Sequence, residues 1–141
     1  MKFQRINRAD PEKVFVVCKN AYTTAALTAG QPVCWAYSGT DDGLAVTRPT
    51  TALLSHTAGI VSGTIAISGY GEIQVYGHNA DALVTGTTDV AVGDKLSAKD
   101  TKLFLIKAAG TLVAGESGVI VAGQAFTTAG ATAKKVFIRC M

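Results

Sequence analysis

Few residues of this 141-residue sequence are of the types that usually carry catalysis or bind metals: three cysteines and two histidines. Cys18, Cys34 and Cys140 show no Cys-x-x-Cys spacing. His56 and His78 have no neighbouring ligands at the spacing a zinc site requires, so we expect no metal. Cys18 and Cys34 lie in apolar runs of a chain without a signal-peptide pattern, which predicts reduced, buried thiols made in a cytoplasm.

The carboxylates also form no catalytic pattern. Asp41 and Asp42 are adjacent in the turn sequence TDDGL, where aspartates ordinarily hydrogen-bond the local backbone. His78 and Asp81 could pair, although a polar loop at a strand end accounts for both. Nucleophile-elbow and HExxH motifs are absent, as is a carboxylate pair flanked by aromatic residues. The sequence therefore predicts no enzyme, no catalytic residue and no cofactor.

A glycine-rich stretch, GIVSGTIAISGYGEIQVYG (59–77), raises the question of phosphate binding. A phosphate cradle would lead into a helix with Lys and Ser or Thr following, and neither is present. Its apolar residues instead alternate, which predicts a half-buried β-hairpin. Gly69 and Gly71 are expected to take the positive φ angles of its turn, and Gly63 and Gly77 to permit a bulge or close packing.

The same period of two recurs along the chain and indicates strands separated by Gly, Thr, Asp and Ser clusters. The expected strands lie at 13–19, 32–38, 102–108, 119–126 and 134–140, besides the hairpin. Turns are expected at 40–44 and 92–96, and at most single helical turns at 9–13 and 23–30. The fold class predicted is all-β, a small β-barrel or β-sandwich of about eight to eleven short strands with little or no helix.

Charge is scarce and unevenly placed. Charged residues make up 16% of the chain, against about 25% in average soluble domains, which favours an oligomer or assembly subunit over an ordinary monomer. The net charge of +3 arises in the first 20 residues, with five cations and two carboxylates, and the remainder is balanced. No basic stripe predicts direct nucleic-acid binding, and no apolar run is long enough to predict a membrane span. We expect an N-terminal arm or edge segment over 1–11 and a single β domain over 12–141.

Three runs carry a family resemblance: AGQPVCWAYSGTDDGLAVTRPTT (29–51), AGIVSGTIAISGYGEIQVYGHNADALV (58–84) and VAVGDKLSA (90–98). Together they resemble the decoration, or cement, proteins on the heads of tailed bacteriophages. The resemblance implies a β-barrel or sandwich subunit that binds the outer capsid surface, bridges major capsid subunits and stabilises the assembled shell. It also implies a homo-oligomer, with a trimer favoured, located on the virion after synthesis in the host cytoplasm.

The basic N-terminal segment is the part expected to contact the capsid. Its apolar anchors and cations are Lys2, Phe3, Arg5, Ile6 and Arg8. The alternative is that residues 2–7 form an ordinary edge strand of the domain.

Two other functions remain open from the sequence. A carbohydrate-binding β-sandwich could use an aromatic platform of Trp35, Tyr37, Tyr70 and Tyr76. Trp35 and Tyr37 alternate on one side of a strand, which favours core packing for both, whereas Tyr70 is expected to be exposed in its turn. The chain could also be another virion subunit, such as a tail-tube or head-completion protein.

Overall fold

The computed structural model describes residues 12–37, 43–86, 88–108, 119–127 and 129–140. These residues form nine strands and one 3-10 helix, η1. The bounds are β1 Lys13–Asn20, β2 Pro32–Trp35, β3 Ala45–Thr47, η1 Thr51–His56, β4 Thr57–Val61, β5 Tyr70–Thr85, β6 Lys95–Ala98, β7 Leu105–Lys107, β8 Val119–Ala122 and β9 Ala131–Arg139. The predicted all-β fold class is thus confirmed.

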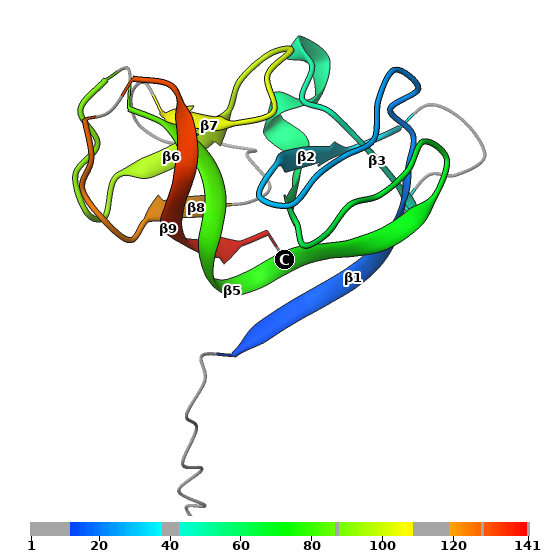
Figure 1. The fold of residues 1–141 in the computed structure, drawn as a ribbon, viewed down its shortest axis with the longest axis horizontal. Helices are drawn as coiled ribbons and strands as arrows, with labels where there is room; N and C mark the ends of the chain where they lie inside the picture. The colour runs from blue at the N-terminus through cyan, green and yellow to red at the C-terminus, as the bar shows by residue number, and fades with distance from the viewer. Residues whose placement is uncertain (1–11, 38–42, 87, 109–118, 128, 141) are drawn as a thin grey trace, which may run out of the picture.

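The strands form two closed rings of five that share the long strand β5. In the first ring the order is β1-β3-β2-β4-β5, and β5 closes it by pairing with β1. In the second the order is β5-β7-β6-β8-β9, and β9 closes it by pairing with β5. Figure 1 shows the two rings side by side, with β5 running from one to the other along the base. Ring closure leaves few open strand edges.

Each ring has its own hydrophobic core, which the alternation of its strands supplies. The first core contains Cys18, Leu27, Val33, Val46, Ala58, Val61, Ile65, Ile73 and Val75. The second contains Ile60, Ala82, Val84, Val90, Leu96, Leu105, Ile120, Ala122, Phe126, Val136 and Ile138. Ile60 is the exception to the division, because β4 is a strand of the first ring while its side chain packs in the second core. The rings are therefore joined by packing as well as by β5.

The second ring repeats the arrangement of the first. The strands β1, β2, β3, β4 and the first half of β5 correspond to the second half of β5, β6, β7, β8 and β9. The registers match: Pro32 of β2 pairs with Ile60 of β4, and Lys95 of β6 pairs with Val121 of β8. The parallel pairing of β1 with β3 is likewise repeated by β5 with β7.

The loops before β2 and β6 repeat as well. Gly30 and Gly93, 63 residues apart, have φ angles of 83° and 88°. The Gly30 N–H donates to Val61 O at 2.9 Å, and the Gly93 N–H donates to Ala122 O at 2.8 Å. Both glycines thus occupy the same left-handed position, which favours a residue without a Cβ.

Several local details differ from expectation. The segment 23–30 has a turn at residues 29 and 30 but no helix, and the 3-10 helix η1 was not predicted. The positive φ in the β4–β5 connection belongs to Ser68, at 59°, rather than to Gly69 or Gly71. Gly71 serves close packing, because a Cβ there would lie 2.5 Å from the Ile65 side chain.

β4 ends at Val61, so the expected hairpin is an antiparallel β4–β5 pair joined by a longer connection. The register pairs Ile60 with Gln74 and Val61 with Ile73. Gly63 lies in that connection with open space around it, not inside a strand. The expected arm over residues 1–11 lies outside the described residues.

Candidate interaction surface

The cysteine thiols are buried or half-buried. Cys18 and Cys34 are free and buried, as predicted, and Cys140 is free and half-buried. Burial raises the pKa of the Cys34 thiol to about 12, against a smaller opposing effect of the Thr57 hydrogen bond. Burial, with the neighbouring Cys34, also raises the pKa of Cys140 to about 12. Thiols with such pKa values stay protonated at neutral pH and are poor nucleophiles.

The histidines have structural neighbours. His56 lies edge-on to Tyr37, with ring centroids 4.9 Å apart, and its Nδ1 lies 3.1 Å from the Ser55 hydroxyl. His78 of β5 is paired with Phe137 of β9. Within the described part of the chain, no group of three His, Cys, Asp or Glu residues is placed to hold a metal ion. No helix among those residues has the length and apolar character to cross a membrane.

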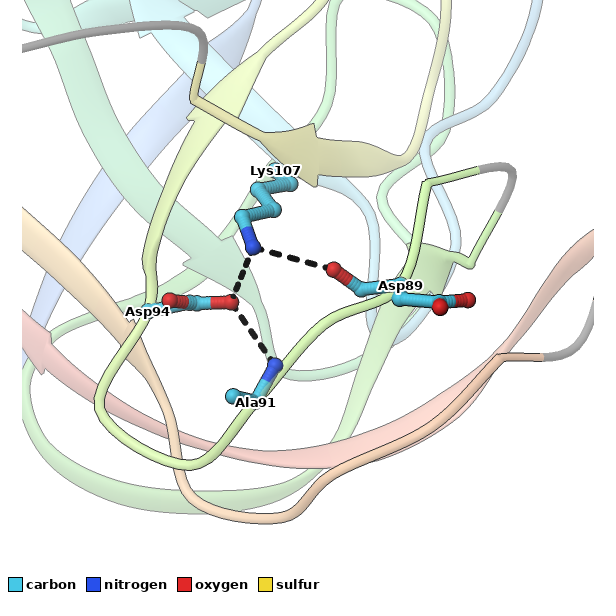
Figure 2. Close-up of polar contacts among 4 residues, drawn as sticks. All are labelled: Asp89, Ala91, Asp94 and Lys107. Carbon is cyan, nitrogen blue, oxygen red and sulfur yellow. Dashed lines mark hydrogen bonds and ion pairs between the residues drawn. The ribbon is translucent and has the colours of Figure 1, made fainter.

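A polar clamp fixes the loop between the second ring's first strands (Figure 2). Lys107 Nζ of β7 contacts the Asp94 carboxylate at 2.7 Å and donates to the Asp89 carbonyl oxygen at 3.0 Å. The Ala91 N–H donates to the same Asp94 oxygen at 2.7 Å. The hydrogen bond from Lys107, followed by that from Ala91, lowers the pKa of Asp94. Because all these groups satisfy one another, the clamp positions the β6 entry rather than forming an open site.

The clearest unpartnered surface lies on β1. We define the β1 face as the outward side chains Phe15 and Val17, which are 43% and 62% exposed. Val17 is paired with Glu72 of β5, and the next outward pair is Lys19 with Tyr70. Tyr70 is exposed, as predicted. The apolar β1 face therefore lies within a rim of charged and aromatic side chains.

The backbone of β1 is also open along one edge. On one side β1 pairs with β5 from Lys13 to Lys19. On the other side its pairing within the described residues is confined to Lys19 and Asn20, which pair with β3. An open edge beside exposed apolar side chains is a template on which another protein can add a strand or pack a face.

A sequence signal for this surface existed in the run KVFVVCK. Its inward residues Val14, Val16 and Cys18 pack on the first core. A strand covered on one face should carry polar residues on the other, yet Phe15 and Val17 are apolar. Apolar residues on both faces indicate contact on both faces.

The residues predicted to contact the capsid all lie outside the described residues: Lys2, Phe3, Arg5, Ile6 and Arg8. The described chain begins at residue 12, so these residues precede β1 in the sequence.

The four aromatic residues considered for a carbohydrate platform have separate neighbours. Trp35 is half-buried against the first core, as expected. Tyr37 is exposed beside His56, so its predicted core packing was wrong. Tyr70, the first residue of β5, is paired with Lys19 of β1, and Tyr76 packs edge-on against Phe137, with centroids 5.5 Å apart.

No protein-family model and no curated protein matches this chain.

Proposed function

We propose that this protein is a structural virion subunit, a head decoration protein that binds the outer surface of an assembled bacteriophage capsid. The observation that carries the proposal is the β1 face with its open strand edge, next to the basic N-terminal segment. The scarcity of charge in the sequence and the protonated thiols agree with a binding role without chemistry.

Stabilisation of the shell follows from mass action. A protein that binds the assembled lattice, but not free capsid subunits, stabilises the lattice by its binding free energy. Phe15 and Val17 are already partly buried, so covering their exposed parts contributes less per copy than the roughly 1.5–3 kcal/mol of burying a fully exposed side chain. The same modest contact repeated at many symmetric sites makes the shell hard to open.

The partners proposed are the major capsid protein and further copies of this chain, with a trimer favoured. Lys2, Arg5 and Arg8 would meet carboxylates of the shell, and Phe3 and Ile6 would fill apolar recesses. Exposed cation–carboxylate contacts contribute about 0–1 kcal/mol each and weaken with salt, so the apolar residues would supply most of the affinity.

The test is binding to capsids that lack the protein. Val17→Lys should leave the domain folded, because this side chain points to solvent, and should weaken shell binding roughly tenfold or more through lost apolar burial. Deleting residues 1–8 should also reduce occupancy on the shell. Binding is measured by co-sedimentation with capsids, and folding by circular dichroism.

Tyr37→Lys is the matched control, since Tyr37 is 52% exposed but packs beside His56 of η1 and is not part of the β1 face. It should bind capsids as the unmodified protein does. Undiminished binding by both Val17→Lys and the deletion would refute this contact surface, and unfolding caused by the deletion would show that residues 2–7 are an edge strand. Location of the protein in a tail or head-completion position of the intact particle, or specific binding on a glycan array without capsid binding, would replace the proposed function by one of its alternatives.

A further inference from the structure

The repeat makes it possible to compare the same surface in the two rings. On the first ring, Cys34 of β2, Ile60 of β4 and Gln74 of β5 point away from the first core and are almost fully buried, with Gln74 2% exposed. Ile60 packs in the second core. Cys34 lies close enough to Cys140 to raise its pKa. The outer face of the first ring is therefore covered by the second ring of the same chain.

The corresponding face of the second ring is only partly covered among the described residues, where Ser97 lines a small cavity with Leu54 and Ser55 of η1. The paired registers place Ser97, Val121 and Phe137 at the positions of Cys34, Ile60 and Gln74. Ser97 and Val121 are half-buried, and Phe137 is 44% exposed. We define the Phe137 face as Val121 and Phe137, together with the exposed Val92 of the loop between β5 and β6.

The residue of the second ring that packs against the first ring also has an equivalent in the first ring. Leu103 of the second ring packs against the first core, and the Thr101 N–H beside it donates to Pro49 O of the first ring at 3.0 Å. The Leu103 position corresponds to Leu44, because Trp35 pairs with Val46 as Ala98 pairs with Leu105. Leu44 is 59% exposed.

A second exposed apolar residue, Ile67, lies at the same end of β1 as Leu44. The Leu44 carbonyl oxygen accepts from Lys19 N–H near the end of β1. Ile67 precedes Ser68, whose N–H donates to Asn20 O at the end of β1. Leu44 and Ile67 are both exposed, and together we define them as the Leu44 patch.

We infer that the Phe137 face binds the Leu44 patch of a second copy, in a head-to-tail contact that repeats between chains the junction between the two rings. Each chain carries both surfaces of this contact. The Phe137 face points away from the first ring of its own chain, so it cannot bind the Leu44 patch of that chain. A second copy supplies an apolar first ring to the exposed side of the described second ring. A head-to-tail contact is heterologous, and it gives a finite oligomer when its rotation closes into a ring.

This inference specifies the surfaces of the proposed self-association, and it is tested without shells. Neither surface contains Phe15 or Val17, which define the β1 face, so failure of shell binding and failure of self-association are separate results. A stable contact needs about 800 Å² per partner, which requires the Phe137 face and the Leu44 patch to be buried together with their surroundings.

The experiment is sedimentation-velocity ultracentrifugation of the full chain with two single variants, Phe137→Lys and Leu44→Lys. The unmodified protein should sediment as an oligomer, and each variant alone as a folded monomer. An equimolar mixture of the two variants should recover a dimer, because Phe137 of one variant and Leu44 of the other complete one intact junction. Val17→Lys, on the β1 face, should remain oligomeric.

Three results would overturn the inference: an unmodified protein that is monomeric at every concentration reached, a Phe137→Lys variant that stays oligomeric, or a mixture that stays monomeric. The last result would show that the Phe137 face and the Leu44 patch do not bind each other, since the mixture contains one intact copy of each. Circular dichroism of each variant separates lost association from lost folding. If Phe137→Lys unfolds, Val92→Lys on the same face takes its place with the same expected outcomes.

Discussion

At the scale of single residues, the two rings solve one problem with different chemistry. In the loop before β2 and in the loop before β6, the last side chain before the strand accepts a hydrogen bond from the backbone N–H three residues earlier. Gln31 Oε1 accepts from Thr28 N–H at 2.9 Å in the first ring, and Asp94 Oδ2 accepts from Ala91 N–H in the second. Only Asp94 is charged, and Lys107 balances that charge. The second ring should therefore respond to pH through this loop.

Asp94→Asn should destabilise the fold at neutral pH and make stability less dependent on acid. Since the folded-state pKa of Asp94 is lowered, the carboxylate contributes stability above its unfolded value of about 3.9, and that contribution is lost as pH falls through the folded value. Thermal unfolding followed between neutral and acidic pH measures this. The difference between variant and unmodified protein should shrink as pH falls.

Asp89→Asn is the control for that experiment, because Lys107 contacts the Asp89 carbonyl oxygen, which the substitution keeps, while its exposed carboxylate points away (Figure 2). Its unfolding curve should follow that of the unmodified protein at all pH values. Equal effects of the two substitutions would mean that general surface charge, rather than the clamp, sets the pH dependence.

At the scale of elements, Gly30 and Gly93 occupy equivalent loops. Comparing the loss of stability caused by the same substitution at each shows how tightly the first loop packs against β5. A Cβ at Gly30 would lie 2.2 Å from Asp81 O of β5, whereas a Cβ at Gly93 has no described atom within 4 Å. Gly30 O also accepts from the Leu83 N–H at 2.8 Å. The first loop is thus pressed against β5, and its counterpart stands free of such a contact.

Gly93→Ala should cost about 1–2 kcal/mol, the strain of a Cβ in left-handed backbone. Gly30→Ala should cost that amount and roughly 1–3 kcal/mol more, because the loop or β5 must move apart. Urea unfolding of dilute protein measures both. Equal costs would indicate that the junction is loose enough to admit a methyl group.

At the scale of the whole molecule, β5 couples the rings. It pairs with β1 and β4 in the first ring and with β7 and β9 in the second. Ile60 and Leu103 each pack in the core of the opposite ring. Neither ring can lose its strands without exposing the core of the other, so the protein should unfold as one unit.

Trp35, the single tryptophan, lies in the first ring and reports on it by fluorescence. Ile138→Ala, in the second core, should cost about 2–5 kcal/mol and shift the Trp35 transition as far as the far-UV circular dichroism transition. Ile73→Ala, in the first core, is the reciprocal variant and should also move both signals together. A Trp35 transition unmoved by Ile138→Ala would show two independently unfolding rings.

The sequence by itself determined the local elements, because they depend on neighbouring residues. Alternating apolar residues predicted β1 nearly to its bounds and β9 from its fourth residue on, and the VGDKL turn was placed correctly before β6. The same pattern predicted the burial of Cys18. Tyr70 is exposed as predicted, although it begins β5 instead of lying in a turn. For the candidate surface, the only signal in the sequence is the presence of apolar residues on both faces of β1. The contact residues predicted in the N-terminal segment lie outside the described residues.

Only the tertiary structure decided the repeat of the rings and the surfaces derived from it. Equivalent positions of the two rings have the same place in the backbone but carry different residue types. Gln31 corresponds to Asp94 and Gln74 to Phe137, so composition and periodicity do not reveal the repeat. Gln74 is buried and Phe137 exposed, which is the opposite of their hydrophobic character. The reason is that burial depends on which ring lies over each face, and that contact joins residues far apart in the chain.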